Sequence, residues 1–239
     1  MTTPGASMVQ ALGPIRVINL PERRDRRRAF ARQLSRVGLG YDDPGVTLVA
    51  AVRPSEPGGF PTVGARGCFL SHLEILRAAH EAGLDRVAIC EDDLDFSEDF
   101  ETRAPALFEA LGEMDWDIFY GGFDAEAHGV ATQPGLVRLD SRQSVVCAHF
   151  MALRRPAIEA LVPYLETMLR REPGDPAGGP MHVDGAYSHF RADHPEIATV
   201  AVTPTLGTQR PSRTDIHDLR WFDRLPIFRE VTELLRRLR

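Results

Sequence analysis

The sequence contains no lysine, so all 28 of its basic residues are arginines. This absence excludes a catalytic Schiff base on a lysine and the phosphate-binding lysine of a P-loop. The sequence also contains no GxSxG, HExxH or GxGxxG motif, so serine hydrolases, zincins and dinucleotide-binding enzymes lose their usual support. Any group that binds an anion here must use arginine, histidine or backbone amides.

Cysteine is scarce, and the three cysteines (Cys68, Cys90 and Cys147) are far apart with no CxxC spacing. This spacing argues against a disulfide framework and against a thiolate zinc site, and it favours a reducing compartment. Residues 1–14 have no basic region typical of a signal peptide, and no apolar run approaches the roughly 18 residues of a spanning helix. We therefore expect a cytoplasmic protein that is soluble or at most peripheral to a membrane, with residues 1–14 as a flexible leader.

Positive charge is not in excess, because 34 acidic residues against 28 basic ones give a net charge of −6. Nucleic acid is therefore not an expected partner. With 239 residues, of which 43% are hydrophobic, the chain can bury a core and fits a single α/β domain over residues 15–239.

Hydrophobic patterning predicts alternating strands and helices in the first half of the chain. Such alternation is typical of a parallel sheet with helices on both faces, where ligands gather at the carboxyl ends of the strands. The expected strands are 15–20, 46–52, 86–90, 117–120, 136–139, 145–153 and 197–202, with a Gly-rich turn directly after strand 117–120. The expected helices are 22–37, 68–82, 98–111, 156–169, 184–190 and an amphipathic one at 219–239.

Three adjacent carboxylates, Glu91, Asp92 and Asp93, follow the apolar strand 86–90. They repel one another unless a cation or nearby arginines neutralise them, and a divalent metal with oxygen ligands, Mn²⁺ or Mg²⁺, would do so most simply. A solvated acidic turn is the alternative.

Groups that can bind an anion lie near the same sheet edge. The segment GARGCFLSH places Gly67, Ser71 and His72 at a predicted helix start, where free amides favour an anion. The arginine run 23–28 opposes the dipole of the first predicted helix, which points to phosphate contact for one or two of these side chains, although a solvated basic face is the default. Alternatively, Gly64 and Gly67 are ordinary loop residues, and His72 is a partly buried helix residue.

Two later segments carry polar groups that can act on a ligand. Asp184 follows a Gly- and Pro-rich loop at a predicted helix N-cap, and its alternative role is capping alone. The polar loop after strand 197–202 can close over a ligand; it carries Gln209, Arg210, Ser212, Arg213, Asp215 and His217.

Five motifs in order resemble glycosyltransferase family 25, which includes bacterial lipooligosaccharide galactosyltransferases and relatives of the collagen galactosyltransferases. They are VINLPERRDRR (17–27), GARGCFLSHLEIL (64–76), VAICEDDLDF (87–96), HVDGAY (182–187) and QRPSRTDI (209–216). The resemblance implies a GT-A-like α/β fold with a mixed, mainly parallel sheet flanked by helices. It also implies a nucleotide-sugar-binding half (about 15–125), an acceptor half (about 126–218), a nucleotide-sugar donor, a divalent metal and inversion at the anomeric carbon.

The resemblance also implies roles for individual residues. The acidic triplet would form the metal motif with Asp93 as the main ligand, and Asp184, or else Asp215, would be the base that takes the acceptor proton. Residues implied at the donor are Asn19, Arg26, Gly67, Ser71, His72 and Gln209; Tyr120, Gly121, Gly122 and Asp124 are expected to border the sugar.

The expected function is therefore an inverting, metal-dependent transfer of a hexose, with galactose as the first candidate, to a saccharide or glycolipid acceptor in surface glycan synthesis such as that of lipopolysaccharide. The C-terminal helix can rest on an anionic membrane surface, or else pack on the core. Two other functions stay open: a metal-dependent phosphoesterase or hydrolase with the same carboxylates, and a noncatalytic nucleotide-sugar-binding protein.

Overall fold

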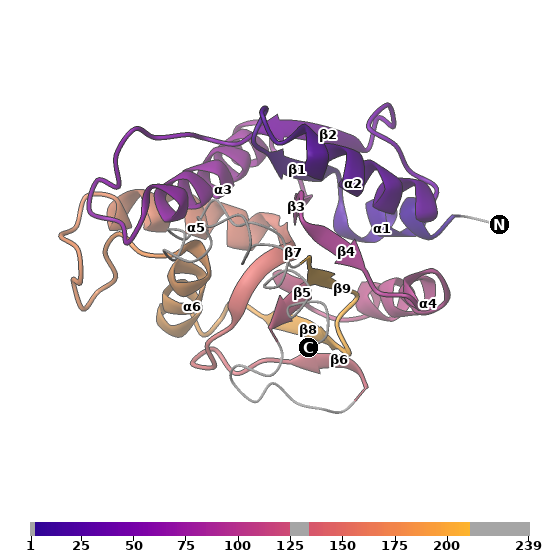
Figure 1. Cartoon of the computed structure of the whole chain (residues 1–239). Helices are drawn as coiled ribbons and strands as arrows, with labels where there is room; N and C mark the ends of the chain where they lie inside the picture. The colour runs from indigo at the N-terminus through magenta and orange to yellow at the C-terminus, as the bar shows by residue number, and fades with distance from the viewer. Residues whose placement is uncertain (1–2, 125–133, 211–239) are drawn as a thin grey trace, which may run out of the picture.

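A seven-stranded mixed sheet forms the centre of the protein, in a computed structural model that describes residues 3–124 and 134–210 (Figure 1). Its strands are β1 (Ile15–Asn19), β2 (Val46–Ala50), β3 (Arg86–Glu91), β5 (Ile118–Asp124), β6 (Gly135–Arg138), β7 (Val146–Arg154) and β8 (Thr199–Thr203). Their order is β2-β1-β3-β7-β5-β8-β6. Five strands share one direction, whereas β7 and β6 run antiparallel to their neighbours. This confirms the expected α/β fold with a mainly parallel sheet.

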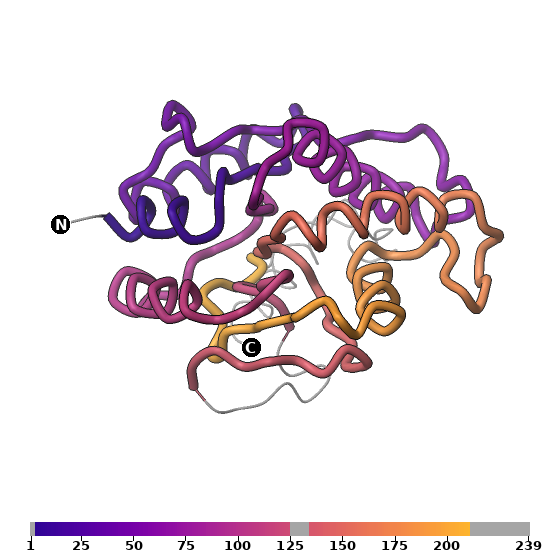
Figure 2. The backbone as a smooth tube through the Cα atoms, turned by 180° about the vertical axis from the view of Figure 1, so that it is seen from behind, coloured from indigo at the N-terminus to yellow at the C-terminus, as the bar shows by residue number. Residues whose placement is uncertain are grey.

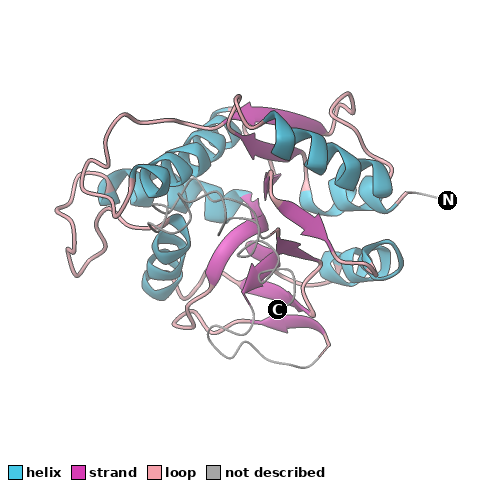
Figure 3. Cartoon of the chain, viewed as in Figure 1, coloured by secondary structure: helices cyan, strands magenta, loops and turns pink. Residues whose placement is uncertain are grey.

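Helices cover both faces of this sheet (Figure 3). They are α1 (Pro4–Leu12), α2 (Arg24–Arg36), α3 (Val63–Glu81), α4 (Phe100–Gly112), α5 (Arg155–Met168) and α6 (Val183–Asp193). One apolar core lies under α3, α5 and α6, and the other lies under α1, α2 and α4. The view from behind shows α1 and α4 side by side on their face (Figure 2).

Strand β3 shows how the sequence builds these two cores. Successive side chains of a strand point to opposite faces, and here Val87 and Ile89 join the first core while Ala88 and Cys90 join the second. The strand is therefore apolar at consecutive positions, and its first acidic residue, Glu91, ends it at the sheet edge.

The first residues differ from the expected flexible leader. Residues 4–12 form helix α1, in which the Thr3 hydroxyl accepts a hydrogen bond from the amide of Ala6, and Pro4 occupies the first helical position. Both residues favour a helix start. Met8 and Leu12 are one helical turn apart and fully buried, so α1 is part of the core.

Two further boundaries also differ. Helix α3 begins at Val63, five residues before the expected start, because the Thr62 hydroxyl caps it by accepting from the Ala65 amide. Strand β5 continues to Asp124 through the segment expected to be a Gly-rich turn. The expected C-terminal helix (219–239) lies outside the described residues.

A second, two-stranded sheet pairs β4 (Leu94–Phe96) with β9 (Gly207–Gln209) in antiparallel fashion. Leu94 is the register partner of Gln209, so the chain after β8 returns beside the acidic triplet at the end of β3. Within the described ranges, no helix is long and apolar enough to cross a membrane.

Candidate functional site

The three carboxylates that end β3 point to three different sets of partners. Glu91 lies against α3, Asp92 lies against β1 and α2, and Asp93 lies between α2 and β9. The triplet is therefore an organised junction of several elements, and not a solvated turn: Asp92 and Asp93 are 4% and 3% exposed.

Asp92 has hydrogen-bond donors on both oxygens. Asn19 Nδ2 donates to Oδ2 at 2.6 Å, and Arg26 Nη1 donates to Oδ1 at 3.1 Å. Burial raises the pKa of Asp92, while these two donors act in the opposite direction. Since both oxygens are engaged, Asp92 is the least available of the three carboxylates to a metal and serves to fix Asn19 and Arg26.

Asp93 has one oxygen to spare. Arg26 Nη1 lies 3.0 Å from Oδ2, and Gln209 Nε2 donates to the same oxygen at 3.4 Å. In the described part of the chain, Oδ1 is buried with no hydrogen-bond partner. Burial, and then repulsion from Glu91, raise the pKa of Asp93 to about 7. A cation at Oδ1 would relieve both effects, so this carboxylate fits the role of a metal ligand.

A cavity of about 330 Å³ opens beside the triplet. It lies where β1, β2 and β3 end, the sheet edge at which α/β proteins bind ligands. Its polar lining includes the three arginines Arg23, Arg26 and Arg53, together with Glu91 and Asp92. Arginine matches phosphate geometry, so this edge can hold a phosphorylated ligand without lysine.

Gly67 and Ser71 shape the wall of that cavity. A Cβ on Gly67 would lie 2.6 Å from the carbonyl oxygen of Val52, so only glycine lets α3 approach the chain after β2 this closely. Ser71 Oγ donates to the Gly67 carbonyl at 2.7 Å and accepts from the Val52 amide at 2.8 Å. Because α3 begins at Val63, Ser71 is in its third turn and not at its start.

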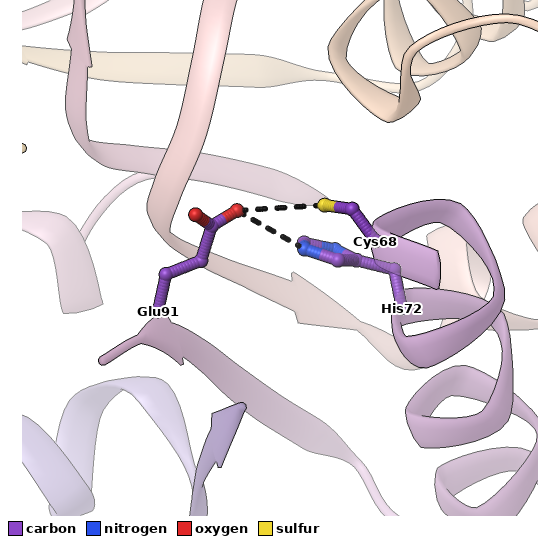
Figure 4. Close-up of side chains that lie close together, drawn as sticks. All are labelled: Cys68, His72 and Glu91. Atoms are coloured by element: carbon purple, nitrogen blue, oxygen red, sulfur yellow. Dashed lines mark hydrogen bonds and ion pairs between the residues drawn. The ribbon is translucent and has the colours of Figure 1, made fainter. Parts of the chain in front are cut away.

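His72 is fully buried behind Glu91 and is not among the residues that line the cavity. Its Nδ1 lies 2.9 Å from the hydroxyl of Tyr187, and its Nε2 lies 3.7 Å from Glu91 Oε1. Cys68 Sγ is also 3.7 Å from that oxygen (Figure 4). Burial raises the pKa of Glu91, but the histidine contacts outweigh it and leave this pKa below its ordinary value.

Asp184 was predicted at the N-cap of this helix, but it is the second residue of α6, and the N-cap is His182. Its Oδ1 accepts from the Gly185 amide at 2.8 Å, and its Oδ2 accepts from the Cys147 amide at 2.9 Å. Asp184 therefore accepts one hydrogen bond from the first turn of its own helix and one from the backbone of β7.

Cys147 shows that this region gathers negative charge from several elements. Its backbone is left-handed, with φ of 65°, at the irregular end of β7. Burial raises the pKa of its thiol to about 12, and so do Asp184, Glu91, Asp124 and Asp93, in that order. These four carboxylates thus all act on the pKa of the Cys147 thiol, and Asp184 also contacts the Cys147 backbone.

The residues expected to border the sugar lie in different environments in the structure. Tyr120 is buried at 1% exposure, and Asp124 is exposed. Gly121 and Gly122 are strand residues at which a Cβ would meet Phe150 at 2.6 Å and His149 at 2.5 Å. These glycines admit β7 side chains and do not form a loop.

The polar loop after β8 is described only as far as Arg210. Arg210 pairs with Asp95 and so anchors β9 to β4. The second candidate base, Asp215, lies outside the described residues, as do Ser212, Arg213 and His217. Sequence spacing missed Cys68, Cys147, His149 and Tyr187, which reach the site only through the fold.

Residues 55–119, which contain the GCFLSH and EDD segments, match the model of glycosyltransferase family 25, described as an LPS biosynthesis protein. Procollagen galactosyltransferase 1-B of Xenopus laevis is 30% identical over 124 residues, covering 44% of this chain and 20% of that protein. Inactive glycosyltransferase 25 family member 3 of Mus musculus is 35% identical over 99 residues, covering 39% and 17%. This chain thus aligns with about a fifth of each relative's length.

A solved glycosyltransferase involved in the glycosylation of the major capsid of PBCV-1 covers 84% of this chain and 94% of its own. It is 13% identical with a TM-score of 0.40, a likeness too low to bear on function. The family model and the curated relatives support the class that the motifs predicted, that of the glycosyltransferases. Within that class, residues 55–119 are similar to glycosyltransferase family 25, the family that the motifs resemble.

Proposed function

We propose that this protein is an inverting glycosyltransferase that moves a hexose, with galactose as the first candidate, from a nucleoside-diphosphate sugar to a saccharide hydroxyl. The observation that carries the proposal is the state of the Asp93 carboxylate. Its buried Oδ1 has no hydrogen-bond partner in the described residues, and burial beside an arginine-lined cavity raises its pKa to about 7.

Asp93 would hold a divalent metal, Mn²⁺ or Mg²⁺, with Glu91 as the second carboxylate of the motif. Such an ion typically takes one or two protein carboxylates and completes its coordination with phosphate oxygens. When bound, it would supply positive charge that stabilises the diphosphate leaving group. Arg26 already contacts Asp93 and lines the cavity, so its guanidinium is placed to share that task.

The cavity between α2, α3 and the end of β1 would receive the nucleotide. Asn19 is fixed by Asp92, and Ser71 and Gly67 hold the wall next to Val52, so this wall is organised before a ligand arrives. Arg23 and Arg53 also line the cavity and would contact phosphate oxygens.

Asp184 would act as the base that takes the proton of the acceptor hydroxyl. Two backbone amides orient its carboxylate, and both Asp184 and Asp93 raise the pKa of the Cys147 thiol, which supports this role. Inversion requires a base on the side of the sugar opposite to the leaving group. That requirement is met if the acceptor enters between α6 and β7.

The names of the relatives guide the choice of substrates. The procollagen galactosyltransferases favour galactose as the donor sugar, and the description of the family favours an acceptor in lipopolysaccharide or another surface glycan. We propose a cytoplasmic site for this reaction.

One specific observation favours a second candidate, a noncatalytic protein that binds nucleotide sugars. The mouse relative that is 35% identical over 99 residues is named inactive. Such a protein would keep the arginine-lined cavity and bind the donor, but no acceptor would raise its turnover.

The test is release of nucleoside diphosphate from UDP-galactose, UDP-glucose and GDP-mannose, with Mn²⁺ or chelator, and with or without a panel of saccharide acceptors. Acceptor-stimulated, metal-dependent release that is lost in Asp93→Asn supports the proposal. The matched control is Asp115→Asn, an exposed carboxylate before β5 that should retain full turnover. Full-rate release without any acceptor would indicate a hydrolase, and donor binding without turnover would indicate the noncatalytic protein.

A further inference from the structure

Three potential metal ligands of different chemistry converge behind the acidic triplet. Cys68 and His72 are four residues apart on α3, so they lie on one face of that helix and point toward Glu91 at the end of β3 (Figure 4). Sγ of Cys68 and Nε2 of His72 each lie 3.7 Å from Glu91 Oε1. All three ligand atoms lie within 4.8 Å of one another.

These separations suit a tetrahedral ion. Bonds of about 2.3 Å to sulfur and about 2.0 Å to nitrogen or oxygen, at tetrahedral angles, separate ligand atoms by about 3.3 to 3.6 Å. The observed 3.7 Å contacts exceed these values by a few tenths of an ångström and are too long for strong hydrogen bonds. The remaining pair, Cys68 and His72, lies within 4.8 Å, so an inward movement of the side chains by about 1 Å or less would enclose an ion.

His72 is oriented as a metal-binding histidine. Its ring is 0% exposed, and its Nε2 makes no hydrogen bond in the described residues, although it faces Glu91. Its other nitrogen, Nδ1, lies 2.9 Å from the hydroxyl of Tyr187, whose oxygen can accept a hydrogen bond from Nδ1–H. Metal-bound histidines are commonly held in this way, because a partner on one nitrogen directs the lone pair of the other toward the ion.

We infer that Cys68, His72 and Glu91 form a binding site for one thiolate-preferring divalent cation, with Zn²⁺ as the first candidate. One sulfur, one nitrogen and one oxygen are ligands that suit Zn²⁺, whereas Mn²⁺ and Mg²⁺ prefer oxygen. Binding would form the sulfur-metal bond as the thiol releases its proton to solvent. Cys68 and Glu91 line the cavity, so the ion can enter from it and keep a fourth position open there.

This site goes beyond the proposed transferase reaction and does not depend on it, although the two share Glu91. An ion here would link α3 to the carboxyl end of β3 at the cavity wall. The cysteine spacing argued against a thiolate zinc site, but that argument concerns sites built from several cysteines. Here a single cysteine joins residues brought together by the fold.

The test is titration of the chelator-treated full chain with Co²⁺, whose bond to a thiolate gives a charge-transfer absorption band. One equivalent of Co²⁺ should produce this band in the wild type and in Asp93→Asn. The band should be lost in Cys68→Ser and kept in the control Cys147→Ser. Tyr187→Phe should weaken Co²⁺ binding by about 10-fold or more, because it removes the partner of His72. No band in the wild type, or an equal band in Cys68→Ser, would overturn the site.

A second measurement needs no variant and so remains decisive if Cys68→Ser fails to fold. Alkylation of each cysteine in the wild type is followed by mass spectrometry with and without Zn²⁺. Zn²⁺ should protect Cys68 and leave the labelling rate of Cys147 unchanged. Equal labelling of Cys68 under both conditions would rule out the site.

Discussion

Arg26 Nη1 lies 3.0 Å from Oδ2 of Asp93, the last carboxylate of the acidic triplet. The same nitrogen donates to Asp92 at 3.1 Å, so one guanidinium lies between two buried carboxylates. Arg26 belongs to α2 and the carboxylates follow β3, so this contact also holds the helix against the sheet edge where the arginine-lined cavity opens.

Replacing Arg26 with glutamine should destabilise the protein and weaken donor binding. Removing one partner of a buried ion pair leaves its carboxylates uncompensated, at a cost of about 3 kcal/mol or more in the free energy of unfolding. Urea denaturation above neutral pH measures this cost. Arg28→Gln, at an exposed position on the same helix, should change stability by no more than about 0.5 kcal/mol. Equal effects of the two substitutions would contradict the role given to Arg26.

The raised pKa of Asp93 predicts a definite pH dependence of stability. The folded protein keeps this proton up to about pH 7, whereas the unfolded chain releases it near pH 4. Between these values the folded state binds more protons, so the contribution of Asp93 to stability falls as pH rises from about 4 to about 7. Thermal melts of metal-free protein should show Asp93→Asn gaining stability over wild type as pH rises. A difference between the two proteins that stays constant with pH would exclude the shift.

The close approach of α3 to the chain after β2 predicts a strong effect at Gly67. A methyl group there would meet the carbonyl of Val52 at 2.6 Å, so Gly67→Ala should cost about 1 to 3 kcal/mol and weaken donor binding. Gly112→Ala is the control, because nothing lies within 4 Å of a Cβ at that position in α4. The control should be neutral or slightly stabilising. Chemical denaturation of both variants is the measurement, and a neutral Gly67→Ala would refute the packing argument.

The role given to Asp184 predicts a loss of turnover without a loss of donor affinity. Asp184→Asn should lower the rate of transfer by about 10² to 10⁴-fold, the usual contribution of a general base. Donor binding should stay near the wild-type value, because Asp184 does not line the donor cavity. Asp193→Asn, an exposed position on the same helix, should keep its turnover. Retained turnover in Asp184→Asn would transfer the role of base to another residue, with Asp215 as the next candidate.

Local patterns predicted the position of the acidic triplet because they depend on near neighbours. A fully apolar strand followed by Glu91 requires only the chain itself. The start of α3 and the existence of α1 could also have been predicted, since Thr62 and Thr3 are residues typical of an N-cap. The glycines and prolines near both threonines favoured a loop instead.

The remaining features depend on contacts between distant segments. Strand direction is not encoded in hydrophobic patterning, so the antiparallel course of β7 could not be predicted. Contacts between residues far apart in the sequence are also not encoded in local spacing. Sequence spacing therefore could not place Cys68 and His72 against Glu91, or Cys147 against Asp184. Gly121 and Gly122 suggested a turn, but they are glycines because side chains of β7 pack against them.

The most direct test of the account is calorimetric titration of UDP, UDP-galactose, UDP-glucose and GDP-mannose into the wild type and Asp93→Asn, with and without Mn²⁺. The account predicts that one nucleotide class binds in a metal-dependent manner and that this binding is lost in Asp93→Asn while the variant stays folded. Binding of no nucleotide under any condition, or unchanged metal-dependent binding in Asp93→Asn, would contradict it.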